Sequence, residues 1–181
     1  ELFLARYIFE VENAGRDVRG FKIFYDQPLG PDHERVWHYL ASLDDLKVIH
    51  LWRRNQIERI VSEIQAQQTD KWTSYQPSPI PPPALDIGVT TFLTKIAQKT
   101  KRREQKMAMF KDHPLLYLEY EDLVRDQPGQ MRRVFEFLGI DPLPVKASTH
   151  RISHGGLRSS LRNYREVQDA LHGTPYAHFI D

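Results

Sequence analysis

The segment from residue 47 to about residue 67 constrains the fold of this chain most strongly. Residues 47–52 form an apolar, β-branched run, which is typical of a strand buried in a parallel sheet. Arg53 and Arg54 follow at once. Apolar side chains then recur at the spacing of one helix face, at Ile57, Ile60, Val61 and Ile64. The pattern therefore predicts a strand, a tight turn carrying two arginines, and a helix.

The start of that helix carries its own signal. Asn55 is a favourable N-cap residue, and Glu58 stands three positions later, as in a capping box. In an open α/β sheet, ligands bind at the carboxyl ends of the strands. The turn at Arg53 and Arg54 is thus a candidate anion site, because arginine offers a planar fork of donors and a helix N-terminus adds backbone N–H groups.

Other periodic segments predict an alternation of strands and helices. We expect further strands at residues 21–25 and 115–120. We expect helices at residues 34–42, 89–110, 131–138 and 164–171, with a weakly periodic one at residues 2–9. Prolines make residues 74–86 an extended loop. This order predicts an α/β fold with a parallel sheet flanked by helices.

Composition narrows the class of protein. The 181 residues are 40% hydrophobic and 27% charged, which suits one globular domain spanning residues 1–181. The net charge of +1 gives no reason to expect nucleic acid as a partner. The chain has no cysteine, no apolar run long enough for a membrane span and no signal-peptide pattern, so we expect a soluble cytoplasmic protein.

Ser62 lies eight residues after Arg54, roughly 12 Å further along the helix. A phosphate lying beside the helix, with the arginine folded along it, would touch both side chains. The spacing fits equally a solvated arginine and a serine that faces water. On the residues alone, both interpretations stay open.

The stretch from Val48 to Ser62 resembles the 3′-phosphate-binding segment of sulfotransferases that use 3′-phosphoadenosine 5′-phosphosulfate (PAPS). In that family a strand ends in an arginine, and a serine follows eight positions later. Residues 116–123 with 135–140 resemble the late strand and next helix of the family, and residues 157–164 resemble its C-terminal segment. The resemblance implies a P-loop-like sulfotransferase fold, with Arg54 and Ser62 on the 3′-phosphate.

The tail departs from the family pattern. Cytosolic members hold the 3′-phosphate with an Arg-Lys-Gly triplet, and the matching positions here are His154, Gly155 and Gly156. Arg151 or Arg158 would supply the missing charge. The resemblance therefore implies a cofactor-binding set comprising Arg54, Ser62, Arg151, His154, Gly156 and Arg158, in a chain closer to the bacterial and carbohydrate-type branch.

The candidate catalytic residues are also inferred from the family resemblance. Phe24 stands where cytosolic members have a histidine base, two residues after Lys22. Glu1, in Glu1-Leu2-Phe3, resembles a Glu-x-Phe segment that supplies the base in other members. Glu1 and Lys22 are thus the implied catalytic residues, and His50 is the next candidate for the base. Lys22 fits equally a contact with the sulfate and one with a neighbouring carboxylate.

The resemblance further implies PAPS as co-substrate, no metal, and an acceptor hydroxyl on a small molecule or carbohydrate, with a lipid-linked hydroxyl also considered. The family's phosphosulfate loop and its strand find no match, so we expect the domain to be N-terminally incomplete. Two alternatives stay open: a nucleotide-kinase-like phosphotransferase, and a non-catalytic binding domain that keeps the fold. Oligomeric state is not predicted.

Three further features have competing interpretations. Trp72 and Tyr75 flank the proline-rich loop and would either line an acceptor pocket or anchor the loop. Basic residues on the helix at residues 89–110 fit a solvated face better than an anionic-ligand patch. His150 and His154 lack partners of metal-ligand type nearby, so we expect no metal site.

Overall fold

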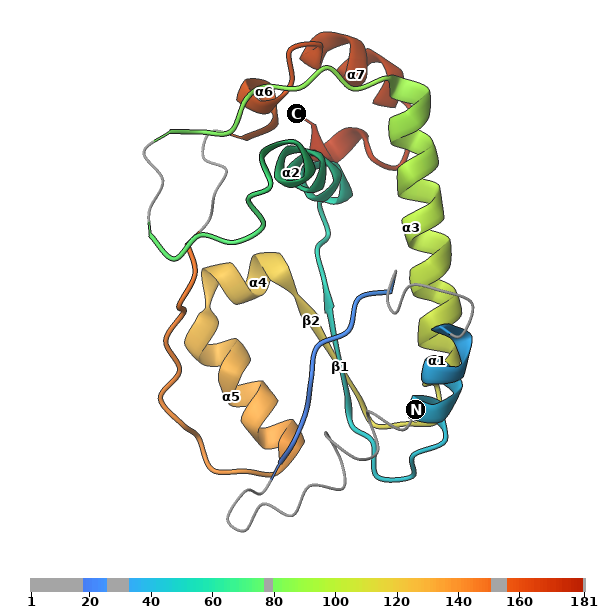
Figure 1. Cartoon of the computed structure of the whole chain (residues 1–181), viewed down its shortest axis with the longest axis vertical. Coiled ribbons are helices and arrows are strands. Elements are labelled where there is room, and N and C mark those ends of the chain that lie inside the picture. Colours follow the sequence, from blue (N-terminus) through green and yellow to red (C-terminus); the bar gives the residue numbers. More distant parts are fainter. Residues whose placement is uncertain (1–17, 26–32, 77–79, 151–155, 181) are drawn as a thin grey trace. The chain divides into compact units, whose positions relative to one another are not determined.

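The computed structural model describes residues 18–25, 33–76, 80–150 and 156–180 (Figure 1). The elements in chain order are α1 (His33–Ala41), β1 (Val48–Trp52), α2 (Gln56–Thr69), α3 (Val89–Met109), β2 (Leu115–Glu119), α4 (Tyr120–Arg125), α5 (Gln127–Leu138), α6 (Gly156–Ser160), α7 (Tyr164–Leu171) and the 3₁₀ helix η2 (Ala177–Phe179). No described helix is both long and apolar enough to cross a membrane.

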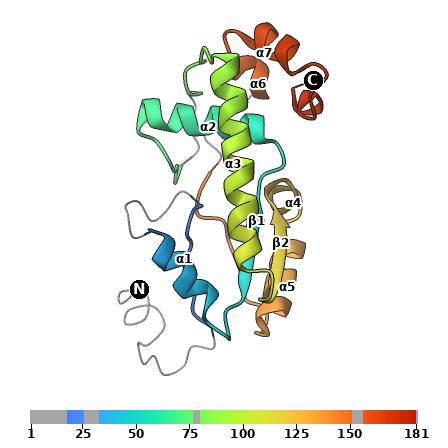
Figure 2. The same cartoon turned by 90° about the vertical axis from the view of Figure 1, so that its right-hand side faces the viewer.

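The chain divides into two compact units. The sheet unit comprises residues 1–52 and 100–145, and the helical unit comprises residues 53–99 and 146–181. Helix α3 is unbroken (Figure 2), and its two parts belong to different units. The prediction of one domain over residues 1–181 stays a prediction.

The sheet unit contains two parallel strands, as predicted. β1 pairs with β2 in a register that runs from Val48 opposite Leu115 to Trp52 opposite Glu119. Parallel pairing requires a crossover, and residues 53–114 with their helices provide it. The α/β class with a parallel sheet is confirmed.

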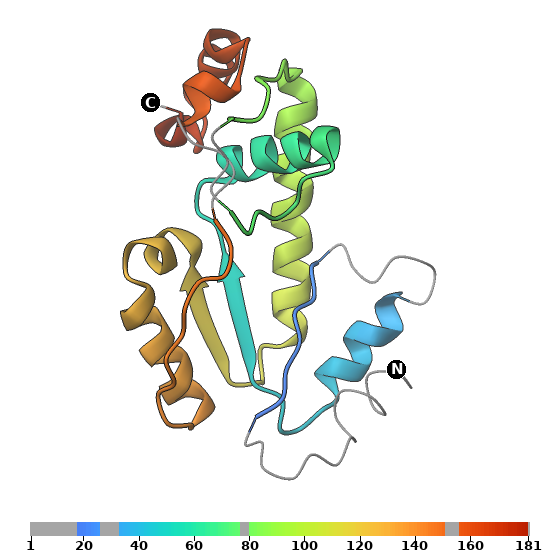
Figure 3. The same cartoon turned by 60° about the vertical axis from the view of Figure 1, so that its left-hand side comes forward.

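The strand predicted at residues 21–25 is wrong. This segment is extended and runs beside β1 (Figure 3), but it joins no hydrogen-bonded ladder with the residues that the structure describes. Ile23 and Tyr25 instead pack by their side chains against a cluster whose buried members are Trp37, Leu40 and Phe110. The alternating apolar residues therefore pack their side chains into this cluster without forming a strand, because a strand also needs a neighbouring strand with which its backbone can pair.

Two boundaries near β2 also differ from the sequence expectation. Tyr120 begins α4 and does not continue the strand, and α5 begins at Gln127, four residues before the predicted start. Asp126 explains the second difference, because its Oδ1 accepts from the Gly129 N–H at 3.0 Å and caps α5. Gly139 ends the helix in the left-handed conformation, with φ of 76°.

The helical unit packs α2, the first part of α3, α6 and α7 around one apolar core. Its fully buried members include Ile57, Phe92, Ile96, Val167 and Leu171. The predicted N-cap of α2 is confirmed, since the Asn55 side chain accepts from the Glu58 N–H at 3.0 Å. The short helix α6 was not predicted, because a five-residue helix is too short to show a period.

The C-terminal segment is joined by backbone hydrogen bonds to the residues that precede α3. The N–H of Leu85 donates to the Ser160 carbonyl at 2.9 Å, and the N–H of Arg162 donates to the Leu85 carbonyl at 2.8 Å. These bonds form an isolated parallel bridge between Leu85 and Leu161. The bridge holds α6 within the helical unit, where it contacts α2.

Candidate functional site

The turn between β1 and α2 gives its two arginines different surroundings. The Arg53 guanidinium forms an ion pair with Glu58, in the first turn of α2, and the Arg53 carbonyl accepts from the Gln56 side chain. Arg54 has an exposed side chain. Arg53 therefore stabilises the turn, and Arg54 is the arginine that reaches solvent at the start of the helix.

Ser62 lies two turns along α2 and lines two small pockets of the helical unit. Its hydroxyl forms no hydrogen bond with any residue that the structure describes, although a serine inside a helix often bonds to a preceding carbonyl. An uncommitted hydroxyl on a partly exposed helix face can donate to or accept from a ligand.

The first of these pockets lies between α2 and α6. Its lining residues are Glu58, Val61, Ser62, Gln65, Gly156, Leu157 and Ser160. Ser62 and Gly156, which are 94 positions apart in the sequence, thus line one pocket. Gly156 has φ of 74°, a left-handed conformation that favours glycine. The Glu58 carboxylate is compensated by Arg53, which reduces its repulsion of an anion.

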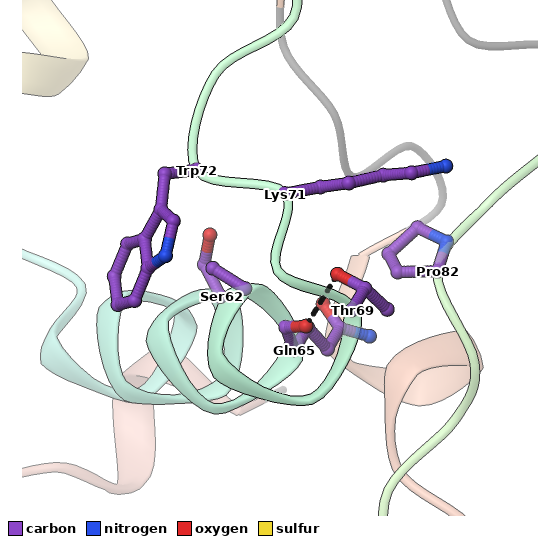
Figure 4. A pocket seen from close by; sticks show the side chains of 7 residues that line it. Ser62, Gln65, Thr69, Lys71, Trp72 and Pro82 are labelled. Atoms are coloured by element: carbon purple, nitrogen blue, oxygen red, sulfur yellow. Dashed lines mark hydrogen bonds between the residues drawn. The ribbon is translucent and has the colours of Figure 1, made fainter.

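The second pocket, which we call the α2 trough, has a cavity volume of about 40 Å³. One stripe of α2 forms its floor, at i, i+3, i+4 and i+7: Ser62, Gln65, Ala66 and Thr69. In Figure 4 the Trp72 indole stands at one end, beside Ser62, while Lys71 extends the opposite way, towards Pro82. The trough therefore offers an aromatic face at one end and a cation at the other.

A comparison with protein families shows which family the chain belongs to. The model of the Sulfotransferase family matches residues 31–144, more than half of the sequence. The chain belongs to the sulfotransferase family. The match includes the β1 turn, α2 and β2, so the resemblance inferred from residues 48–62 and 116–140 is confirmed at the level of the family.

Curated relatives agree with this assignment. Nodulation protein H of Rhizobium tropici is 30% identical over 160 residues, which cover 87% of this chain and 61% of the relative. Nodulation protein H of Rhizobium meliloti (strain 1021) is 28% identical over 159 residues, covering 86% of this chain and 64% of the relative. The chain thus spans about three fifths of the length of these relatives. No solved structure matches it.

The structure describes part of the residue set implied by the family resemblance. Arg54, Ser62 and Gly156 belong to the helical unit, and the last two share a pocket. Arg158, on α6, is exposed and forms no hydrogen bond or ion pair with a described residue. Glu1, Arg151 and His154 lie outside the described residues. The roles of the whole set in this member of the sulfotransferase family stay predictions.

Lys22 belongs to the sheet unit, and its side chain is exposed. The Lys22 amine lies 4.8 Å from the centroid of the Phe24 ring, so the residue at the position of the family's histidine contacts the lysine. A cation over an aromatic ring is a weak interaction at an exposed site. Lys22 is thus held loosely and can turn to an anionic ligand.

His50, the second candidate for the base, is only 4% exposed. Neither ring nitrogen has a hydrogen-bond partner among the residues that the structure describes, and the ring contacts Tyr25, Trp52 and Tyr117. Burial, and secondly the positive charge of Arg103, lower the pKa of His50 to about 4. Among the described residues this imidazole is enclosed by aromatic rings, and its role as a base stays a prediction.

Three basic residues of α3 make contacts within the fold. Lys99 lies 2.8 Å from Glu63, and Lys106 lies 2.8 Å from Glu34. Arg103 lies over the Trp52 ring, 4.6 Å from its centroid. These contacts within the fold explain the presence of three of the basic side chains, and no anionic ligand is needed to explain them. Among the residues that the structure describes, no group of three or more His, Asp or Glu side chains could hold a metal ion.

Proposed function

We propose that this sulfotransferase binds PAPS and transfers its sulfuryl group to an acceptor hydroxyl. The observation that carries the proposal is the α2 surface, where exposed Arg54 precedes the helix and the uncommitted Ser62 hydroxyl shares a pocket with Gly156. Two segments that resemble the family's 3′-phosphate site therefore meet in one pocket: the start of α2, through Ser62, and the C-terminal segment, through Gly156. Family membership supports the same reaction class.

The residues present fit the 3′-phosphate end of the nucleotide. Arg54 supplies a fixed positive charge with donors matched to phosphate oxygens, and Ser62 supplies a neutral O–H donor. Gly156 leaves room, since a Cβ added there would meet no described atom within 4 Å. Arg158 adds a second arginine on α6, the helix that contains Gly156. We assign these four residues to the 3′-phosphate, with Arg151 and His154 as additional candidates.

Bound PAPS supplies the activated sulfuryl group, and adenosine 3′,5′-bisphosphate is the leaving product. The acceptor oxygen forms its bond to sulfur as the bond to the bridging oxygen breaks, and the acceptor proton must pass to a base. We assign that proton to the Glu1 carboxylate and charge stabilisation at the sulfate to Lys22. Positioning and charge then carry most of the catalysis, as in phosphoryl transfer.

Thermal unfolding with three additions tests the proposal. Adenosine 3′,5′-bisphosphate should raise the midpoint, because a ligand that binds only the folded state stabilises it. ATP with Mg²⁺ should raise it less. A larger shift with ATP and Mg²⁺ would favour a phosphotransferase, and no shift with either nucleotide would favour a domain that keeps the fold without the site.

A further inference from the structure

Gln56, in the first turn of α2, is a polar side chain at a position where an apolar one would be expected. It is 4% exposed, and its helix neighbours Ile57, Ile60 and Val61 are buried apolar residues of the helical unit's core. A buried amide lowers stability unless its polar atoms have hydrogen-bond partners. The reason for a glutamine at this position therefore lies in the hydrogen bonds that its amide makes.

Both ends of the Gln56 amide are engaged. Its Nε2 donates to the Arg53 carbonyl, and its Oε1 accepts from Arg59 Nη1 at 3.2 Å. These partners fix the orientation of the amide, because a carbonyl only accepts and a guanidinium only donates. Arg59 thus holds the amide in the orientation in which its N–H group faces the turn between β1 and α2.

The contact with the Arg53 carbonyl acts on Arg54. That carbonyl belongs to the planar peptide group that joins Arg53 to Arg54, so its direction sets how the chain enters Arg54. On the other side, the Asn55 side chain accepts from the Glu58 N–H at 3.0 Å and donates to the Phe179 carbonyl at 3.4 Å. The backbone on both sides of Arg54 is therefore held by side chains, while the Arg54 side chain itself is exposed.

A fixed backbone at Arg54 favours the binding of an anion. Ordering a long side chain on binding reduces affinity, and a site already held in its bound geometry avoids part of that loss. Gln56 is buried and lines neither pocket beside Ser62, so its amide affects binding through the residues that it holds. Glu58, in contrast, lines a pocket with Ser62, so a substitution there would alter the site directly.

We propose that Gln56 is a positioning residue, which holds the turn between β1 and α2 so that Arg54 presents its guanidinium to the 3′-phosphate. The inference rests on the proposed function, because it takes Arg54 as a phosphate ligand. It deepens that function by making the selectivity for a 3′-phosphate depend on a buried amide two residues along the chain. A Gln56 with a purely structural role would instead affect the stability of the fold and leave selectivity between nucleotides unchanged.

Calorimetric titration of the full chain with adenosine 3′,5′-bisphosphate and with adenosine 5′-phosphate tests the inference. Gln56→Met keeps a side chain of similar length and removes both hydrogen bonds. It should weaken binding of the bisphosphate about three- to tenfold and leave the affinity for adenosine 5′-phosphate within about twofold of wild type. In an Arg54→Ala background the same substitution should cause no further loss, because Gln56 acts through Arg54.

His113→Phe is the matched control. His113 Nε2 donates to the Ala41 carbonyl at 3.0 Å in the sheet unit, so this variant also loses a side-chain hydrogen bond to a backbone carbonyl. It should lower the stability of the fold and leave the affinities for both nucleotides unchanged. Gln56→Leu, which removes the same two hydrogen bonds from α2, serves as the second variant if Gln56→Met does not fold.

Three results would overturn the inference. They are an unchanged affinity of the Gln56 variant for the bisphosphate, equal losses for the two nucleotides, and a loss that persists in the Arg54→Ala background. If Arg54→Ala weakens bisphosphate binding and the Gln56 variant does not, this inference fails and the proposed function stands. If Arg54→Ala itself leaves bisphosphate binding unchanged, the proposed function is contradicted and the inference fails with it.

Discussion

The side chain of Asn163 replaces a missing backbone partner for Ile87. Its Oδ1 accepts from the Ile87 N–H at 3.1 Å, and its Nδ2 donates to the Ile87 carbonyl at 2.9 Å. The pair lies two residues beyond the backbone bridge between Leu85 and Leu161 and continues it. The amide of Asn163 therefore fixes the segment before α3 against the segment that carries α6.

Asn163→Ala should lower the free energy of unfolding by about 1–3 kcal/mol, because the N–H and the carbonyl of Ile87 both lose their partner. Urea unfolding measures the change. Arg162→Ala is the neighbouring control: the Arg162–Asp86 pair at 2.6 Å is exposed on both sides, so its loss should cost well below 1 kcal/mol. Equal losses of unfolding free energy in the two variants would show that the hydrogen bonds between Asn163 and Ile87 contribute no more than a surface ion pair.

His50 should make stability depend on pH. The pKa of His50 is lowered to about 4 in the folded chain, by burial first and by Arg103 second, from 6.5 in the unfolded chain. The unfolded state then binds the proton more tightly, so the free energy of unfolding falls as pH drops from about 6.5 towards 4. The loss attributable to this group is roughly 3 kcal/mol or less.

Urea unfolding of wild type and His50→Phe at pH 7.5 and pH 5 separates this contribution from those of other titrating groups. The variant should lose less stability than wild type between the two pH values, since its aromatic ring cannot be protonated. Identical losses in the two proteins would mean that His50 is hydrated or paired in solution.

The pair of Lys106 and Glu34 predicts an asymmetry between two substitutions. The Lys106 amine donates to both carboxylate oxygens of Glu34, at 2.9 and 2.8 Å, and Lys106 is 8% exposed whereas Glu34 is exposed. Glu34→Gln leaves the buried ammonium without its counter-charge. Lys106→Met removes that charge and keeps an apolar stem over Trp37, so it should cost less.

The expected difference is about 1–2 kcal/mol in the free energy of unfolding, with Glu34→Gln the less stable protein. Chemical denaturation at low ionic strength measures both variants. A Lys106→Met protein as unstable as Glu34→Gln, or less stable, would show that packing of the lysine outweighs its charge.

The sequence predicted those parts of the fold in which local signals and tertiary packing agree. The strand at residues 47–52 and helix α2 were predicted because the β-branched run, Asn55 and the apolar period all point the same way. The strand predicted at residues 21–25 was wrong, because strand formation depends on a neighbouring strand that the local pattern does not specify. Ser62 was named from resemblance, whereas its proximity to Gly156 depends on the bridge at Leu85 and Leu161.

The trough was only half predictable. Trp72 was predictable as a pocket residue because it is an aromatic residue beside a proline-rich loop. The stripe of Ser62, Gln65 and Thr69 follows from helical spacing. The meeting of that stripe with Trp72 and Pro82 depends on how the loop folds back along α2, which no local pattern encodes. Tyr75, named with Trp72, does not line the trough.

The central claim is that Arg54 and Ser62 bind a 3′-phosphate. Calorimetric titration with adenosine 3′,5′-bisphosphate and with adenosine 5′-phosphate tests it, because the two ligands differ only in that group. For the bisphosphate, Arg54→Ala should cost about 1.5–3 kcal/mol and Ser62→Ala about 0.5–1.5 kcal/mol, whereas neither should weaken adenosine 5′-phosphate appreciably. Equal losses for the two nucleotides, or unchanged affinity of Arg54→Ala for the bisphosphate, would contradict the assignment.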